Sequence, residues 1–293
     1  MRVFLTGATG FIGSAIVPEL LGAGHRVLGL ARTDAAAQAL ARAGVEAHRG
    51  ELTDTDSLAA GARACDGVIH TAFIHDFSQY AANAQIDRLA LEAMAEALEG
   101  TDKPLVAASG TLMLAPDRTA TEEDRVPPGS FGRMSEVVLE FAGRGVRSSV
   151  VRLSPTVHGR GDKGFVPQLI DIARRTGFAA FVGDGANRWP AVHRLDAARL
   201  FRLALEDAAP GARLHGVAEE GIAMREIAQT IGDGLGLPVR GIDADAAFAH
   251  FGWMGMLAGI DGPASSVLTR ETLGWRPREA GLLADMRDGG YFG

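Results

Sequence analysis

The sequence predicts an α/β fold, a Rossmann-type doubly wound parallel sheet with a smaller C-terminal substrate lobe. Two observations predict it: a glycine-rich turn joins the first apolar strand to the first amphipathic helix, and strands then alternate with helices through the first half of the chain. Strands connected by helices require right-handed crossovers, which cover both faces of a parallel sheet. We therefore expect a dinucleotide-binding core over residues 1–154 and, over 155–293, mainly a substrate-side lobe interleaved with the last sheet elements.

The glycine-rich turn is the motif TGATGFIG, residues 6–13, between a strand at 2–6 and an amphipathic helix. In such a unit Gly7 permits the tight turn, Gly10 lets the backbone approach a pyrophosphate, and Gly13 lets the helix pack close to the strand. The N–H groups at the start of the helix then face the phosphates. The spacing is GxxGxxG rather than GxGxxG, and a purely structural turn is the alternative. The flanking strand and helix favour a dinucleotide site.

The second strand predicts which dinucleotide binds. It spans 26–31 and is followed by Arg32, 19 residues after Gly13, close to the spacing of about 20 at which this fold places its ribose-binding residue. An acidic residue there would bind the ribose hydroxyls of NAD, whereas an arginine favours the 2′-phosphate of NADP. Asp34 is a rival for the ribose, but it also resembles the N-cap of a helix at 35–43. The alternative for Arg32 is a solvated side chain. NADP is the predicted cofactor, with NAD less favoured.

The later elements continue the alternation. Strands are predicted at 45–48, 67–71, 104–108 and 147–153, the last completing the sheet. Helices are predicted at 55–63, 78–98, 133–143, 164–175, 196–207, 223–234 and 266–273. Asp54 or Thr55 is expected to cap the helix at 55–63, and Asp196 the helix at 196–207. Ligands of such sheets lie beyond the carboxyl ends of the strands, so the informative loops follow residues 6, 31, 50, 71, 108 and 153.

Composition excludes several classes of protein. The chain is 47% hydrophobic and 22% charged, which excludes a disordered or collagen-like protein. No apolar run approaches the roughly 18 residues of a membrane helix, and a net charge of -7 lacks the basic field that nucleic acid demands. The single cysteine, Cys65, excludes an internal disulfide and a cysteine zinc site, and the chain lacks HExxH. We expect a cytoplasmic protein with a small-molecule substrate and no metal. The oligomeric state stays open, a homodimer included.

Several motifs together resemble the extended and atypical short-chain dehydrogenases/reductases of the NAD-dependent epimerase/dehydratase type, over nearly the whole chain. Besides TGATGFIG they are Glu51-Leu52, VIHTAF at 68–73, RLSPTVHGRGD at 152–162, VHRLDAARLF at 192–201 and LGWRP at 273–277. The resemblance implies that Glu51 and Leu52 lie beside the adenine. It also implies a set of further cofactor-binding residues: Thr9, Phe11 and Ile12 in the glycine turn, Thr71, Ala72 and Phe73 after the fourth strand, and Pro155 and Val157 beside the nicotinamide.

The usual catalytic set of this family is a Ser or Thr, a Tyr-x-x-x-Lys pair and an Asn, and the sequence departs from it. The helix that would read YxxSKxxxE reads GRMSEVVLE, residues 132–140. Gly132 takes the place of the tyrosine and Glu136 that of the lysine, while Ser135 and Glu140 match. Neither Tyr80 nor Tyr291 is followed four residues later by a lysine. The resemblance thus implies an eroded acid/base site.

Four residues are the candidates for catalysis. Ser109 best matches the family hydroxyl, and Thr111 is the alternative if the loop register slips. Asp87 falls where the asparagine would lie, and its alternative is a helix-face carboxylate paired with Arg88 or another neighbour. His158, in the segment that resembles the nicotinamide wall, could supply a proton, and its alternative is a histidine bonded to backbone. Arg133 would be a poor proton donor, and water is a further source.

Three functions follow from this reading. The leading one is an NADP(H)-dependent oxidoreductase that moves hydride to or from a small carbonyl or alcohol. The second is a non-enzymatic NADP-binding sensor or partner protein, which the missing tyrosine and lysine favour. The third is a sugar-nucleotide epimerase or dehydratase, which ranks last because that chemistry depends most directly on the tyrosine.

Overall fold

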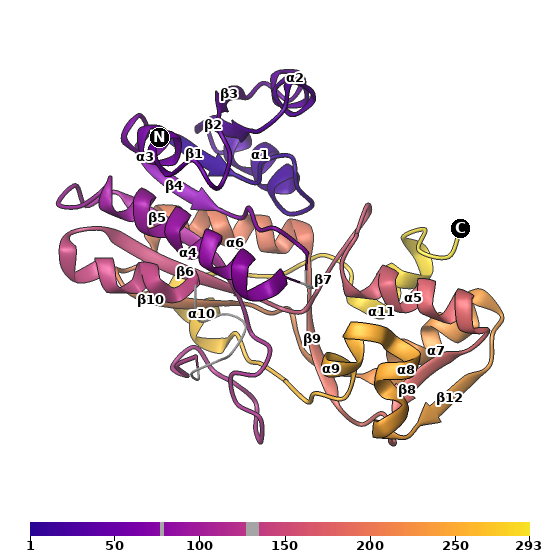
Figure 1. Ribbon diagram of the computed structural model, residues 1–293. Coiled ribbons are helices and arrows are strands. Elements are labelled where there is room, and N and C mark those ends of the chain that lie inside the picture. The colour runs from indigo at the N-terminus through magenta and orange to yellow at the C-terminus, as the bar shows by residue number, and fades with distance from the viewer. Residues whose placement is uncertain (77–78, 127–134) are drawn as a thin grey trace.

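The computed structural model describes residues 1–76, 79–126 and 135–293 and confirms the predicted fold class. Seven parallel strands form the central sheet in the order β10-β6-β5-β4-β1-β2-β3 (Figure 1). Their bounds are β1 Arg2–Thr6, β2 Arg26–Ala31, β3 Glu46–Arg49, β4 Gly67–His70, β5 Pro104–Gly110, β6 Arg147–Leu153 and β10 Ala212–Gly216. The strand order reverses between β1 and β4, the position where doubly wound sheets bind their ligands.

Helices cover both faces of this sheet. One face carries α1 (Gly13–Gly22), α2 (Asp34–Arg42) and α6 (Arg194–Asp207), and the other carries α3 (Thr55–Arg63), α4 (Tyr80–Glu96) and the 3-10 helix η2 (Ser135–Arg144). Successive strand residues point to opposite faces. Leu5 of β1 therefore joins the core under α1 and α6, while its neighbour Phe4 joins the core under α3 and α4. Both are fully buried, as a doubly covered sheet requires.

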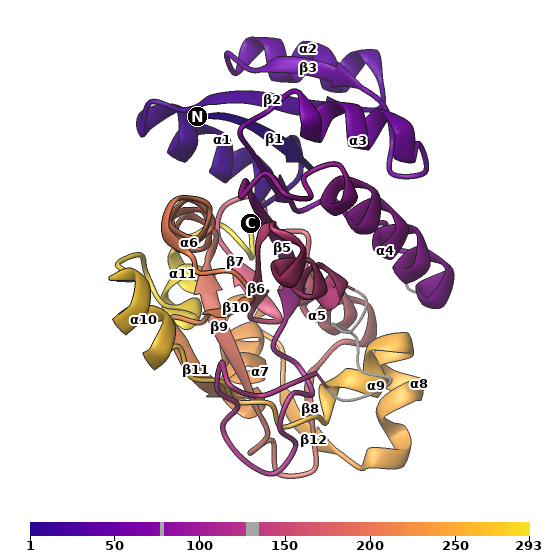
Figure 2. The ribbon, with the colours of Figure 1, turned by 90° about the vertical axis from the view of Figure 1, so that its left-hand side faces the viewer.

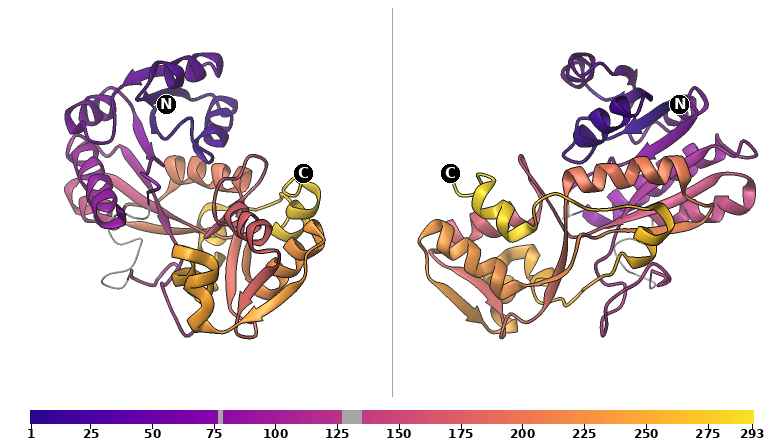
Figure 3. Two further views of the ribbon diagram at one scale, coloured as in Figure 1. Left: turned by 45° about the vertical axis from the view of Figure 1, so that its right-hand side comes forward. Right: turned by 180° about the vertical axis from the view of Figure 1, so that it is seen from behind.

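The remaining elements build a lobe to one side of the sheet (Figures 2 and 3). It contains a three-stranded sheet of β7 (Thr156–His158), β9 (Arg188–His193) and β11 (Glu219–Ala223), and a pair, β8 (Ala179–Val182) and β12 (Val239–Ile242). Its helices are α5 (Phe165–Thr176), α7 (Met224–Leu235), α8 (Ala247–Phe251), α9 (Gly255–Ala258) and α11 (Leu282–Asp288), with short 3-10 turns η3 (Ala244–Ala246) and η4 (Gly252–Met254). The buried Trp189 belongs to its separate core.

The sheet does not end where the sequence predicted. The strand at 147–153 was expected to complete it, but β10 adds a seventh strand beside β6. Its sequence, ARLHG, carries an arginine and a histidine, so its apolar signal is weak. The short helix α10 (Val267–Leu273) also supports this strand, because its Thr269 Oγ1 accepts a hydrogen bond from the N–H of His215 at 2.8 Å. The α6–β10 segment thus belongs to the sheet rather than to the lobe.

Two predicted helix caps were wrong. Thr33, not Asp34, caps α2 by accepting the N–H of Ala36 at 3.2 Å, so Asp34 is left to pair with Arg49. His193, not Asp196, caps α6. Asp196 is buried instead, where its carboxylate accepts the backbone N–H groups of residues 278 and 279 and so anchors the segment after LGWRP. The predicted cap at Asp54 is confirmed by its bond to the N–H of Ser57.

Among the described helices, none is long and apolar enough to cross a membrane.

Candidate active site

The glycine turn is built against the carboxyl end of β4. Gly7 has a φ of +72°, and a Cβ there would lie 2.8 Å from both Thr71 Oγ1 and the backbone nitrogen of Ala72. A Cβ at Gly13 would lie 2.0 Å from the carbonyl oxygen of Gly7. A Cβ at Gly10 would meet only backbone of Gly7, at 3.0 Å or more. Positions 7 and 13 therefore need glycine to close the turn, whereas the outer side of Gly10 is open for a ligand.

The start of α1 fits a diphosphate. Its N-cap is Ile12, which forms no side-chain capping bond. The N–H groups of Ser14 and Ala15 bond to the carbonyl oxygens of Gly10 and Ile12, so the N–H groups of residues 11–13 are the ones left for a ligand. Thr9 and Gly10 are exposed, while Phe11 and Ile12 are half-buried. The positive end of the helix dipole lies here as well. The backbone of this turn thus offers what a dinucleotide diphosphate needs.

The adenosine side is defined by residues after β2 and β3. Arg32 is exposed and forms no ion pair within the described part of the chain. Its rival Asp34 is bound to Arg49 at 2.6 Å. Glu51 is exposed and accepts a hydrogen bond from Thr53 Oγ1, and Leu52 packs on the core beneath α3. Arg32 is therefore available to an incoming phosphate, and Asp34 is engaged.

The residues that follow β4 contact the end of β1, where the glycine turn begins. Thr71 Oγ1 donates to the carbonyl oxygen of Thr6 at 2.9 Å, and the Ala72 N–H donates to Thr6 Oγ1 at 3.4 Å. The Phe73 ring packs edge-on against His75, with 5.4 Å between centroids. Pro155, directly before β7, and Val157, within it, are half-buried. These positions carry the predicted cofactor-flanking residues.

The two candidate hydroxyls differ in their surroundings. Ser109 lies near the carboxyl end of β5 and is half-buried. Thr111 is 1% exposed, and its hydroxyl donates to the carbonyl oxygen of Leu153 at 3.3 Å. A hydroxyl committed to backbone in this way is poorly placed to meet a substrate. Of the two residues, Ser109 is the more exposed.

Asp87 is a buried member of a polar network, not a surface helix residue. Its Oδ1 lies 2.9 Å from His70 Nε2, and its Oδ2 accepts the Ser135 hydroxyl at 3.0 Å. His70 Nδ1 in turn lies 2.9 Å from Thr6 Oγ1. Of the expected alternatives, a pair with Arg88 is not formed, because that guanidinium bonds Glu92, whereas a pair with other neighbours is. The network joins η2, α4, β4 and β1 directly beneath the glycine turn.

The position of the family lysine carries a carboxylate that is already paired. Glu136 Oε1 accepts from Arg152 Nε at 2.6 Å, and the Arg152 side chain is fully buried. Arg152 also approaches His215 Nε2 at 3.3 Å. Glu136 therefore neutralises a buried arginine instead of supplying a cation. Gly132 and Arg133, which complete this motif in the sequence, lie outside the described residues.

His158 occupies the buried side of β7. Its Nδ1 lies 2.8 Å from Asp285 Oδ2, its ring packs edge-on against His193, and its Nε2 is buried without a partner in the described structure. Val157 is the more exposed neighbour, because alternate strand residues face opposite ways. Proton donation by His158 stays a prediction, and this burial argues against it.

Two residues of α4 have surroundings that sequence reasoning did not predict: Tyr80, considered only as the start of a Tyr-x-x-x-Lys pair, and Asn83, not considered at all. Tyr80 packs 6.2 Å from the Phe73 ring, and burial together with the charge of Asp87 raises its pKa to about 12. Asn83 is buried, and its side-chain amide donates to the carbonyl oxygen of Asp76 at 2.8 Å. The spacing of Tyr80 and Asp87, two helical turns, is the signal that would have placed both on one face.

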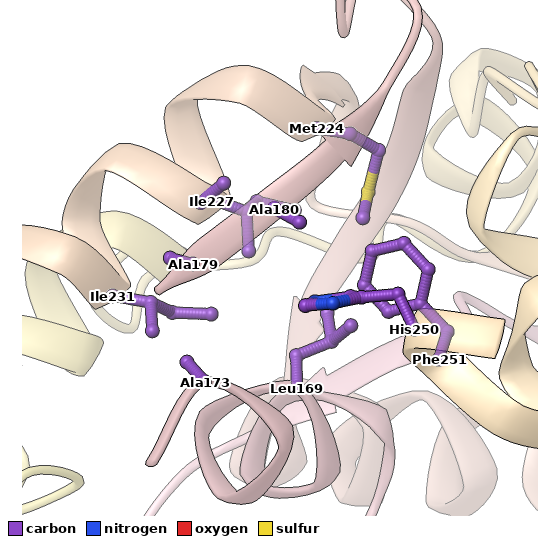
Figure 4. Close-up of a pocket in the computed structure, with 10 residues that line it drawn as sticks. Leu169, Ala173, Ala179, Ala180, Met224, Ile227, Ile231, His250 and Phe251 are labelled. Carbon is purple, nitrogen blue, oxygen red and sulfur yellow. The ribbon is translucent and has the colours of Figure 1, made fainter. Parts of the chain in front are cut away.

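Other sites are not supported. The described residues hold no group of three or more histidine, cysteine, aspartate or glutamate side chains that could bind a metal. A small pocket between α5, β8, α7 and α8 is lined by apolar side chains around His250 (Figure 4). Those side chains belong to the lobe core, among them Leu169 and Phe251. The carboxyl ends of the parallel strands, not this pocket, remain the candidate active site.

Comparisons with known proteins identify the family. Residues 3–215 match the model of the NAD dependent epimerase/dehydratase family. Over its whole length the chain is 48% identical to all of the uncharacterized protein C2A9.02 of Schizosaccharomyces pombe. Over 81% of its length it is 28% identical to the 2-alkyl-3-oxoalkanoate reductase of Stenotrophomonas maltophilia, of which the match covers 77%.

A solved structure extends the likeness to the fold. The UDP-glucose 4-epimerase of Thermus thermophilus, in complex with NAD, superposes with a TM-score of 0.78 at 20% identity, covering 100% of this chain and 99% of that one. The family match spans well over half of the chain, including the glycine turn, the sheet and α6. The chain therefore belongs to the NAD-dependent epimerase/dehydratase family.

Proposed function

We propose that the protein is an NADP(H)-dependent oxidoreductase that transfers hydride to or from a small carbonyl or alcohol without a Tyr-Lys pair. One observation carries the proposal: the paired parallel strands β1 and β2 are followed by a glycine turn and by an exposed Arg32 that has no ion pair within the described chain. When bound, the cofactor supplies or accepts hydride at its nicotinamide ring. The reductase name of the Stenotrophomonas relative supports a carbonyl as the substrate class.

The residues of the chain have separate tasks in this proposal. The backbone from Gly7 to Gly13 holds the diphosphate, and Arg32 binds the 2′-phosphate. Ser109 donates a hydrogen bond to the substrate oxygen as negative charge develops there during reduction. The Asp87 network holds a second hydroxyl, Ser135, in a fixed position on η2. One of these hydroxyls, or a water molecule, passes the proton to the substrate oxygen.

A non-enzymatic NADP-binding protein is the second candidate. It is favoured by the ion pair between Glu136 and Arg152, which commits the position of the family lysine to holding the fold. Under either function we propose a small-molecule ligand rather than nucleic acid, given the net charge of -7. The buried, unpaired thiol of Cys65 suits a reducing cytoplasmic compartment.

Turnover separates the two candidates. The purified protein is mixed with NADPH and a panel of aldehydes, ketones and imines, and NADPH oxidation is followed by absorbance. We expect oxidation with at least one carbonyl, and loss of that activity in Gly10→Val, whose side chain would occupy the phosphate side of the turn. Tight NADPH binding without turnover on any member of the panel would contradict the enzyme and favour the binding protein.

A further inference from the structure

Arg194, the first residue of α6, reaches the glycine turn. Its guanidinium carbon lies 4.8 Å from the centroid of the Phe11 ring, and Nη2 donates to Ser14 Oγ at 3.1 Å. Nη1 donates to the carbonyl oxygen of Arg160 at 2.9 Å. One side chain therefore connects the start of α1 with the loop that follows β7, on the two sides of the proposed cofactor site.

The charge of Arg194 is not neutralised by the described protein. Both hydrogen-bond acceptors are neutral oxygens, Arg194 makes no ion pair with any carboxylate of the described chain, and its Nε is buried without a partner. Burial lowers the pKa of the guanidinium from its ordinary value, which is the cost of withdrawing a cation from water. Arg194 is half-buried, and a guanidinium that lacks a carboxylate partner and has an unpaired Nε favours an anionic ligand.

The position of Arg194 in the fold adds further positive potential around its guanidinium. A cation in the first turn of a helix opposes the helix dipole, and Arg194 begins α6. It also contacts Ser14 in the first turn of α1, a second positive helix end. The two helices pack along each other (Figure 3), and Arg202 of α6 bonds Glu19 of α1 at 2.7 Å. Two helix N-termini and one arginine thus converge here, and Asp196, the acid in the first turn of α6, is bound to Arg199 and to the N–H groups of residues 278 and 279 instead of Arg194.

The backbone of Gly159 and the Phe11 ring pack against the Arg194 side chain from two sides. Gly159 has a φ of +134°, and a Cβ at that position would lie 2.9 Å from both Arg194 Cγ and His193 Nε2. A side chain at residue 159 would therefore displace the arginine stem. The Phe11 ring supports the guanidinium from the other side by a cation–π contact.

We infer that Arg194 is a diphosphate-binding residue of the cofactor site, supplying charge from α6 to a bridge that the glycine turn otherwise binds through backbone N–H groups alone. This inference rests on the proposed dinucleotide function. Arg32 would then read the 2′-phosphate at one end of the cofactor, and Arg194 the diphosphate at its centre. The two arginines should respond differently to fragments of the cofactor.

Fragment binding to two arginine variants tests this division. Calorimetry is run with 2′-phospho-ADP-ribose, which has the diphosphate, and with 2′-AMP, which lacks it. Arg194→Met keeps an apolar stem over Phe11, and we expect it to weaken binding of 2′-phospho-ADP-ribose by at least about tenfold, as loss of a charge-assisted hydrogen bond should, while 2′-AMP binds as to wild type. Arg32→Ala should weaken both ligands. Arg175→Met, an exposed arginine of the lobe, is the matched charge control and should change neither.

The fragment titrations can overturn the inference separately from the proposed function. Equal binding of 2′-phospho-ADP-ribose by Arg194→Met and wild type would overturn the inference while leaving the dinucleotide site intact. Equal weakening of both ligands in Arg194→Met would also overturn it, since that pattern indicates a disturbed fold; a thermal unfolding curve and partial rescue by Arg194→Lys provide the check. If wild type bound neither ligand, the proposed function would fail together with the inference.

Discussion

At the scale of single residues, we propose that Arg32 sets the cofactor preference of the site. In Arg32→Ala we expect NADPH to lose most of its affinity advantage over NADH, because one charge-assisted bond to the 2′-phosphate contributes roughly 1.5–3 kcal/mol. NADH binding should stay nearly unchanged. The measurement is a calorimetric titration of each cofactor into each protein.

Arg26→Ala is the matched control for that substitution. Arg26 is an exposed arginine at the opposite end of β2, so replacing it with alanine removes one positive charge at a position distant from the site. If Arg26→Ala reduced the preference for NADPH as much as Arg32→Ala does, the preference would come from net charge and not from a phosphate contact.

The loop hydroxyls can be ranked by kinetics. Ser109→Ala should lower kcat/KM for the best carbonyl about a hundredfold, because losing one preorganised donor to a developing oxyanion costs roughly 3 kcal/mol. Thr111→Val should have a smaller effect on chemistry, since its hydroxyl is committed to the Leu153 carbonyl. Tyr80→Phe should change the rate little. A large loss in Tyr80→Phe with Ser109→Ala near wild type would place the proton donor on α4 instead.

Single-residue roles were predictable where spacing fixes them. The glycine spacing of TGATGFIG predicted a turn that excludes side chains at Gly7 and Gly13, and both are too crowded for a Cβ. The direction of a strand side chain was not predictable in the same way, because a shift of one residue reverses the face. His158 was a candidate proton source because its segment resembles the nicotinamide wall, and only the structure gives the partner of its imidazole, Asp285.

The Asp87 network connects elements, so its removal should affect stability. In Asp87→Ala the buried His70 and Ser135 lose a shared acceptor, and a buried polar group left unpaired costs about 1–3 kcal/mol. We expect the free energy of unfolding in urea to fall by at least that amount. Glu92→Ala breaks a more exposed pair on the same helix and should cost less than about 0.5 kcal/mol. Equal effects of the two substitutions would contradict a buried network.

Elements were predicted well where periodicity was strong. Strands β1, β2 and β6 and helix α3 have the predicted bounds. The missed strand β10 shows the limit: ARLHG is stabilised by pairing with β6, a contact between residues far apart in the chain that no local pattern contains. Helix starts failed where several capping residues stand together, as with Thr33 beside Asp34.

Acid should destabilise the whole molecule through buried histidines. Burial lowers the pKa of His215 from 6.5 to about 4, so between these pH values the unfolded chain binds a proton that the folded chain does not. Stability contributed by the neutral imidazole is present above pH 6.5 and is lost as the pH falls toward 4, by about 1.4 kcal/mol per pH unit. Burial shifts His193 and His250 in the same direction, whereas the raised pKa of Asp162 acts oppositely.

A substitution isolates the His215 contribution. Unfolding free energies of wild type and His215→Asn are measured from pH 7 down to pH 4, the value near which the histidine titrates in the folded chain. The variant is expected to be less stable at neutral pH, since it loses the contact with Arg152, but its curve should be flatter. Parallel curves for the two proteins would show that His215 is not the group responsible.

The arrangement of the whole molecule places every proposed cofactor contact at one edge of the sheet. The glycine turn, Arg32, the residues after β4 and the start of β7 all follow carboxyl ends of strands or lie beside them. This convergence was predictable from the alternation of strands and helices. The identity of the substrate was not, because the lobe that faces this edge is assembled from separate segments between residues 156 and 293.

The central claim is that this edge binds NADPH, and direct titration of the cofactor tests it. Calorimetry of the wild-type protein should show saturable binding of NADPH that is at least about tenfold tighter than binding of NADH. Gly10→Val should remain folded by circular dichroism and give no binding heat. Tighter binding of NADH than NADPH, or normal NADPH binding by Gly10→Val, would contradict the account.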